Sequence, residues 1–164
     1  MERGQAVLKL FLDELGIPFD VQTLDDRKRV QKAVYLGQKL SGVDLGYTFG
    51  WYIMGPYCPS LTRDYFDLAE ALGAGDSDCE GKSLRESARK KLAIVKPVLQ
   101  VPQDISLPLE DWLELVASLH FLKAISKLSD QESYEILRKE KSHVYGFSNR
   151  AKEILIKNKF WPEN

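Results

Sequence analysis

The sequence predicts a mainly α fold: a single compact helical domain over residues 1–164 with about six to seven helices. A short aromatic β-strand or hairpin is expected between the second and third helices. Three observations predict this fold. Apolar residues recur at helical spacing through most of the chain, capping signals precede several of these segments, and residues 47–61 concentrate aromatic residues, glycines and prolines. No repeat, low-complexity tract or linker divides the chain.

The composition is that of an ordinary globular protein. Hydrophobic residues make up 44% and charged residues 29%, with a formal net charge of −1, so no strong general attraction to nucleic acid or to an anionic membrane is expected. No apolar run approaches the roughly 20 residues that span a bilayer, and charges interrupt the amino-terminal segment. We therefore expect no membrane association, signal peptide or anchor, and a cytoplasmic location, in which Cys58 and Cys79 stay reduced.

The first two helices are expected over residues 4–15 and from residue 23 to residue 40. Gly16 and Pro18 end the first, whose apolar stripe is Val7, Leu10, Phe11 and Leu15. Thr23 and Asp26 form a capping box for the second. The apolar stripe of the second helix consists of Val30, Ala33, Val34, Gly37 and Leu40. Its remaining side is expected to be exposed and carries Lys28, Gln31, Lys32, Tyr35 and Gln38.

Residues 48–53 are predicted to form the strand, because β-branched and aromatic residues favour pleated, half-buried surfaces. Alternation predicts that Phe49, Trp51 and Ile53 share the buried face. Gly55 and Pro56 are expected to break the strand in a rigid turn, since proline fixes its φ and glycine adopts conformations closed to other residues.

The remaining helices follow from stripes and caps. Ser60 is expected to cap a third helix that continues to residue 72, followed by an exposed loop over residues 74–82. A helix from residue 83 to residue 96 is expected to end at Pro97, and an irregular connector to lead to Pro108. The most apolar helix, over residues 108–125, is expected to be central. A helix capped by Ser129 and Glu132, an extended segment over residues 142–147 and a last helix over residues 148–158 complete the chain.

Few residues point to catalysis, metal binding or a cofactor, and we expect none of the three. His120 lies on an apolar helix without a ligand partner at metal-binding spacing, which favours a partly buried structural histidine, and His143 is expected at the surface. Cys58 could act as a nucleophile only if a base came near it. A small enzyme that uses Cys58 or His120 therefore remains an alternative.

Basic residues gather at the start of the second helix, namely Arg27, Lys28, Arg29 and Lys32. They could form a small anion site or, together with residues 85–91, contact nucleic acid, although neighbouring acidic residues weaken such a site. A nucleic-acid-associated accessory protein is thus a second alternative. The aromatic residues Tyr47, Trp51, Tyr52 and Tyr57 have two interpretations, a partly buried cover for a short sheet or a recognition surface.

Two motifs in residues 27–72 carry a family resemblance. The first, on the second helix, is Val30-Gln31-Lys32-Ala33-Val34-Tyr35-Leu36, and the second, after the aromatic strand, is Met54-Gly55-Pro56-Tyr57-Cys58-Pro59-Ser60-Leu61. In this order the motifs resemble those of the YwgA-like proteins and, more distantly, of the SocA-like antitoxin domain, also called Panacea. The strand differs from the usual SocA-like pattern, because Ile53 and Met54 precede Gly55, and the chain after residue 82 has no recognisable match.

The resemblance implies a binding role. SocA-like domains neutralise toxins by direct protein contact, in one case as an adaptor that delivers the toxin to a protease, and Gln31, Lys32, Gly55 and Pro56 look like fold determinants. We therefore expect an antitoxin-like or adaptor-like interaction module rather than an enzyme, with a protein partner and no cofactor. The candidate contact residues are Tyr35, Gln38, Tyr47, Trp51, Tyr52, Gly55, Pro56, Tyr57 and Arg63.

Overall fold

The computed structural model describes residues 1–163, and in this range it contains eight helices and one hairpin. The elements are α1 (Arg3–Leu15), α2 (Leu24–Ser41), β1 (Gly50–Tyr52), β2 (Gly55–Tyr57), α3 (Pro59–Gly73), α4 (Glu86–Leu99), α5 (Leu109–Ala124), α6 (Asp130–Glu140), α7 (Ser142–Tyr145) and α8 (Ser148–Lys157). The mainly helical fold with a hairpin between the second and third helices is confirmed. The described chain has one helix more than expected, namely α7.

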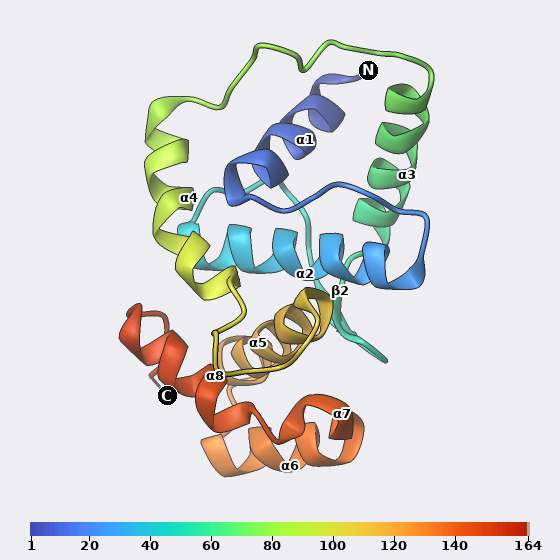
Figure 1. Cartoon of the computed structure of the whole chain (residues 1–164). Coiled ribbons are helices and arrows are strands. Elements are labelled where there is room, and N and C mark those ends of the chain that lie inside the picture. Colours follow the sequence, from blue (N-terminus) through green and yellow to red (C-terminus); the bar gives the residue numbers. More distant parts are fainter. Residues whose placement is uncertain (164) are drawn as a thin grey trace.

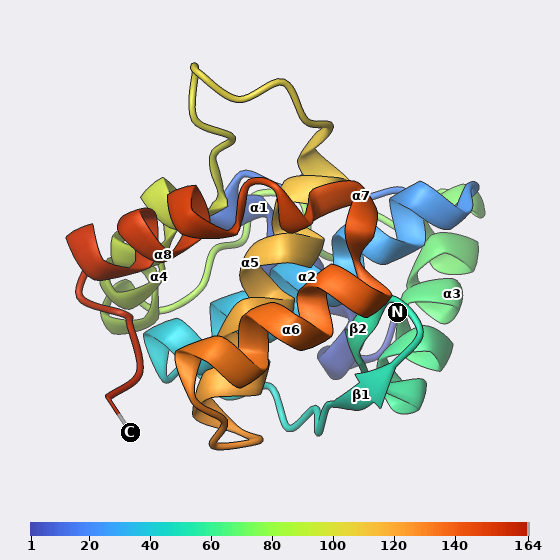
Figure 2. The same cartoon turned by 90° about the horizontal axis from the view of Figure 1, so that it is seen from below.

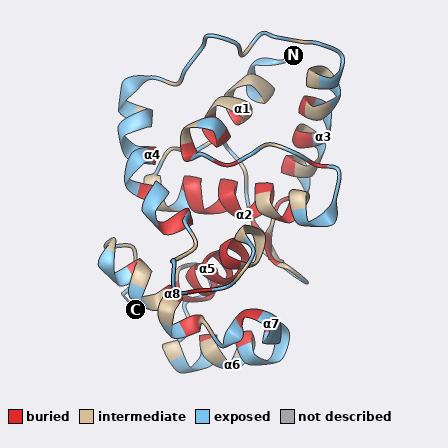
Figure 3. Ribbon diagram, viewed as in Figure 1, coloured by how far each residue is buried: buried red, intermediate tan, exposed pale blue. Residues whose placement is uncertain are grey.

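Helices α2 and α5 pack against each other at the centre of the molecule (Figures 1 and 2). Helices α1, α3 and α4 contact α2, and α6, α7 and α8 contact α5. Every residue of α5 from Trp112 to Lys123 is buried, which confirms that this helix is central (Figure 3). No helix within residues 1–163 combines the length and apolar character that crossing a membrane requires.

Helix α2 does not have the exposed side that the sequence predicted. All of its residues from Val30 to Gln38 are buried, including Tyr35 and Gln38. The expectation failed because polar side chains were assigned to solvent, whereas here they hydrogen-bond the segment that covers them. Tyr35 and Gln38 therefore cannot belong to a surface formed by this helix.

The hairpin also differs from the predicted strand and turn. β1 and β2 pair antiparallel, with Gly50 opposite Tyr57 and Tyr52 opposite Gly55, so the turn lies at Ile53 and Met54. Gly55 and Pro56 begin β2 instead of breaking the strand. Proline is tolerated there because both strands of a two-stranded sheet are edge strands.

Burial of the strand follows the predicted alternation only in part. Phe49 is buried and Trp51 is half-buried, but Ile53 is 90% exposed because it belongs to the turn. Trp51 packs against Phe121 of α5, with 5.7 Å between the ring centroids. The hairpin is thus anchored at its base and exposed at its tip.

Two of the predicted caps are confirmed, and two helices begin elsewhere than predicted. Thr23 and Ser129 accept hydrogen bonds from the third residue of their helices in complete capping boxes. Helix α3 begins at Pro59, in the first-turn position that proline favours, with Cys58 rather than Ser60 as its cap. Helix α4 begins at Glu86, not at residue 83.

Helix α4 also continues through Pro97, where the sequence predicted its end. Proline costs a hydrogen bond inside a helix, but the residues that follow it, Val98 and Leu99, are buried in the core. The Trp112 indole donates a hydrogen bond to the Val98 carbonyl oxygen at 3.0 Å. Tertiary packing therefore sustains this last turn. Likewise, residues 142–147 are not extended, because α7 buries Val144.

Candidate functional site

Polar side chains of α2 hold the backbone of the segment that leads through the hairpin. The Gln31 side chain donates to the Cys58 carbonyl oxygen at 3.0 Å, and its own oxygen accepts from the Cys58 N–H at 2.9 Å. Gln38 accepts from the N–H groups of Leu45 and Tyr47 and donates to the Tyr47 carbonyl oxygen. The helix thus supplies the partners that buried backbone groups require.

Two buried lysines hold the hairpin itself. The Lys32 ammonium nitrogen, Nζ, lies 2.7 Å from the Pro56 carbonyl oxygen, and Nζ of Lys141 donates to the Ile53 carbonyl oxygen. Lys32 and Lys141 are each only 1% exposed. Since Lys32 comes from α2 and Lys141 from the junction of α6 and α7, the two halves of the chain meet at the hairpin. These contacts agree with the role of fold determinant expected for Lys32.

Glu114 of α5 is the centre of a buried charge cluster. Its carboxylate lies 3.0 Å from Nζ of Lys28, 3.2 Å from Nζ of Lys141 and 2.8 Å from Nε2 of His143. Burial alone would raise the pKa of Glu114, but the hydrogen bonds from His143 and Lys28 outweigh it and lower that pKa. Glu114 therefore stays ionised at neutral pH and ties α2, α5 and the segment after α6 together.

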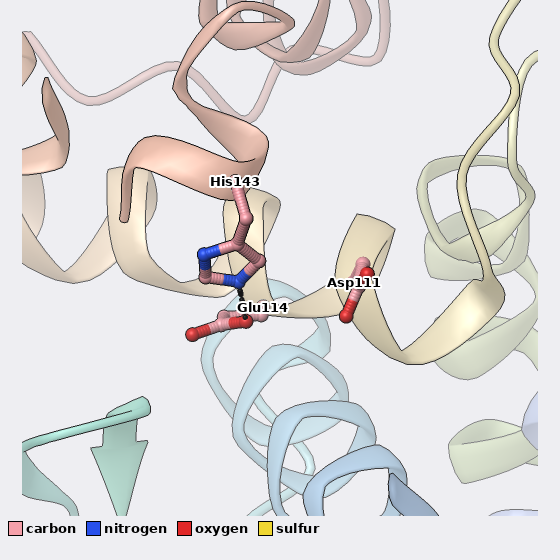
Figure 4. A group of neighbouring side chains, drawn as sticks. All are labelled: Asp111, Glu114 and His143. Atoms are coloured by element: carbon pink, nitrogen blue, oxygen red, sulfur yellow. Dashed lines mark hydrogen bonds and ion pairs between the residues drawn. The ribbon is translucent and has the colours of Figure 1, made fainter. Parts of the chain in front are cut away.

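Asp111, Glu114 and His143 are grouped in a way that a metal ion could use (Figure 4). Their ligand atoms all lie within 4.8 Å of one another. However, Nζ of Lys28 lies 2.7 Å from Asp111 and 3.0 Å from Glu114, so an ammonium group already bridges the two carboxylates. A metal ion would have to displace this lysine. The geometry is that of an ion-pair cluster rather than of a metal site.

A groove of about 210 Å³ lies beside the charge cluster, between α2, the hairpin and α3. We call it the hairpin groove, and its lining residues are Leu24, Arg27, Lys28, Gln31, Lys32, Met54, Tyr57, Thr62, Tyr65 and Phe66. Four polar residues of α2 line it together with apolar and aromatic side chains from all three elements. An apolar cleft with a few polar groups is typical of sites that bind small molecules or single side chains.

The tip of the hairpin, Tyr52, Ile53 and Met54, adjoins this groove. Tyr52 is 49% exposed and Ile53 is 90% exposed, and a second hollow of about 300 Å³ lies among the tip residues and Tyr57. Leu24 and Phe66, which line the groove, are also exposed large apolar residues. The exposed apolar surface therefore runs from the tip to the opening of the groove.

The structure separates the predicted contact residues into buried and accessible groups. Tyr52 and Arg63 are exposed, and Tyr47, Trp51 and Tyr57 are half-buried. Tyr35, Gln38, Gly55 and Pro56 are buried and hold the structure. The groove residues Leu24, Met54 and Phe66 and the tip residue Ile53 were not among the candidates. No local signal marked Ile53 as exposed, because the sequence placed it on the buried face of the strand and put the turn at Gly55 and Pro56.

The basic residues at the start of α2 are already engaged by the protein. Lys28 and Arg29 pair with acidic residues of α5, and Arg27 donates to the carbonyl oxygens of Val21 and Gln22. Lys32 is buried under the hairpin. The four residues therefore do not form an open basic face, which is the feature that nucleic-acid contact would require.

Cys58 and His120 lie in settings that do not pair a nucleophile with a base. Cys58 is 2% exposed, and its sulfur lies 3.2 Å from the Ser60 hydroxyl. His120 is buried, shares a 2.8 Å hydrogen bond with the Tyr35 hydroxyl, and has its pKa lowered to about 4 by burial. The expected structural histidine is found. His143, expected at the surface, is half-exposed and bound to Glu114.

Comparisons of the chain with protein-family models, with curated proteins and with solved structures gave no match. The resemblance to the YwgA-like and SocA-like proteins thus stays a prediction that rests on the two motifs.

Proposed function

We propose that the chain is a protein-interaction module, antitoxin-like or adaptor-like in its mode of action, that binds a protein partner through the hairpin tip and the hairpin groove. The observation that carries this proposal is the 90% exposure of the Ile53 side chain at the tip of a hairpin whose backbone is held by two buried lysines. An apolar side chain held out on a rigid support loses little conformational entropy when it binds.

The groove suits the same role. A partner could insert one apolar side chain between Phe66 and Met54 while the tip contacts the surrounding surface. Interfaces draw most of their binding energy from a few such apolar or aromatic anchors. The motif resemblance also points to direct protein contact, and a cytoplasmic location fits such a role.

The proposal is tested by affinity capture from lysate of the source organism, followed by binding measurements with the purified candidate partner. Ile53→Ser should weaken binding by about tenfold or more if Ile53 is an anchor. Ile94→Ser is the matched control, because Ile94 is also an exposed isoleucine, 61% exposed, but lies on α4. Equal loss in both variants, or a captured protein that binds Ile53→Ser as tightly as the original chain, would contradict the proposal.

A further inference from the structure

Lys32 differs from the other lysines around the hairpin in having no carboxylate partner. Among the described residues, Lys28 and Lys141 pair with Asp111 and Glu114, whereas no carboxylate oxygen lies within 4 Å of Nζ of Lys32. Its one hydrogen-bond acceptor is the neutral carbonyl oxygen of Pro56. Two cations and two carboxylates already balance, so an ammonium at residue 32 would be an unpaired third cation.

An unpaired buried ammonium is costly, and the physical response is loss of its proton. Burial is the main cause that lowers the pKa of Lys32 to about 7; Glu114 opposes this shift, and the nearby Lys141 and Lys28 contribute to it. The groups that face Lys32 thus come from α5 and the α6–α7 junction as well as from its own helix. About half of the Lys32 side chains are then uncharged near neutral pH, whereas an ordinary lysine is almost fully protonated.

Lys32 is one of the residues that line the hairpin groove, which opens to the surface. We propose that the hairpin groove binds small apolar aldehydes and that the amine of Lys32 condenses with them to form an imine. The size of the groove, about 210 Å³, suits a compact ligand, because pockets for drug-sized molecules measure roughly 300–1,000 Å³. Leu24, Met54 and Phe66 offer apolar contact to the ligand, and Lys32 is among the polar residues that line the groove.

The reaction needs no further reagent. The nitrogen lone pair adds to the carbonyl carbon, and the carbonyl oxygen takes up a proton to give a carbinolamine. The proton taken up by the oxygen is the equivalent of one lost from nitrogen, and loss of the hydroxyl group with the one remaining nitrogen proton, as water, leaves a carbon–nitrogen double bond. Lysines that are uncharged in apolar surroundings are known to react in this way. This inference is independent of the proposed protein partner.

The test treats the folded, unmodified protein with benzaldehyde and sodium cyanoborohydride, which delivers hydride to the imine carbon and fixes the adduct as a secondary amine. Peptide mapping by mass spectrometry then gives the labelling rate of each lysine. Lys39, an exposed lysine on the same helix, is the internal control. We expect Lys32 to be labelled at least about tenfold faster than Lys39 near pH 7, with half of its maximal rate near that pH.

Two further measurements locate the reaction in the groove. Met54→Trp, which places a larger side chain at the groove, should slow the labelling of Lys32 at least about fivefold and leave that of Lys39 unchanged. Lys32→Met, if near-ultraviolet circular dichroism shows it folded, should lose the fast site altogether. The inference is overturned if, in the folded original chain, Lys32 is labelled more slowly than Lys39. This outcome needs no variant.

Discussion

Gly55 lies so close to Ser118 that a β-carbon at residue 55 would be 2.4 Å from the Ser118 hydroxyl oxygen. Gly55 also has a φ of +91°, in the region that favours glycine. Two independent constraints, backbone conformation and space, therefore require glycine where the second strand crosses α5. This relationship explains why the hairpin enters the core at this residue.

Gly55→Ala should lower the free energy of unfolding by about 2 to 4 kcal/mol, since it adds a collision to the cost of a positive φ. Chemical denaturation measures the change. Gly42→Ala is the control for backbone strain alone, because Gly42 has a φ of +79° with no atom within 4 Å of the added carbon. Its expected cost is only about 1 kcal/mol.

Ser118→Ala separates the two effects at residue 55. The Ser118 hydroxyl has no hydrogen-bond partner among the described residues, so its removal alone should change stability by less than about 1 kcal/mol. In the double variant with Gly55→Ala, the collision is relieved and only the strain of about 1 kcal/mol should remain. Additive losses in the double variant would show that Ser118 is not what excludes a side chain.

The lowered pKa of Lys32 predicts that the protein becomes more stable as the pH rises. The pKa of its amine is lowered to about 7 by burial in the folded state and returns to the ordinary value on unfolding. Between these two values the unfolded chain binds more protons, so from about pH 7 to pH 9 this group should add roughly 2 kcal/mol of stability. Urea denaturation at several pH values measures it. In Lys32→Met this increase should vanish, and an unchanged pH dependence would contradict the assignment.

The lowered pKa of His120 predicts a pH dependence of stability in the same direction, but on the acid side. Burial lowers its pKa to about 4, and the unfolded chain therefore binds more protons below the ordinary value. Between about pH 7 and pH 5 the folded state should lose roughly 2 kcal/mol through this residue. His120→Asn should reduce this loss of stability. His143→Gln is the control, because it changes the other histidine. Equal acid sensitivity of the original chain and His120→Asn would count against this explanation.

Glu114→Gln should destabilise the protein by about 3 kcal/mol, because it leaves the buried ammonium of Lys141 without its carboxylate and weakens the pairing of Lys28. Thermal unfolding measures the effect. Glu135→Gln is a matched change at a solvent-exposed ion pair with Arg138, where water screens the charges and little or no loss of stability is expected. Similar losses in both variants would mean that the cluster does not hold the helices together.

Elements that depend on local signals could be predicted from the sequence. The apolar residues of α5, from Trp112 onward, specified a buried helix, and Thr23 and Ser129 gave capping boxes that the structure contains. Their hydrogen bonds join residues three positions apart, so the necessary information is local. The predicted position of the aromatic segment between the second and third helices holds for the same reason.

The candidate site could be predicted only in part. Tyr52 and Tyr57 were named as candidates, and Tyr52 is exposed while Tyr57 is half-buried, but Tyr35 was assigned to a surface that does not exist. The burial of a polar helix face depends on which segment covers it. For α2 this segment is the hairpin together with α5, and the pairing of Lys28 with Glu114 joins residues 86 positions apart.

The sequence by itself determined the helical class, the central helix, two of the caps and the need for an aromatic hairpin, because periodicity and capping act over a few residues. The tertiary structure alone decided that Lys32 is buried without a carboxylate partner and that Ile53 is exposed at the tip of the hairpin. The physical reason is that charge pairing and exposure depend on neighbours brought together by folding. Residues distant in the chain supply those neighbours, and no local pattern encodes them.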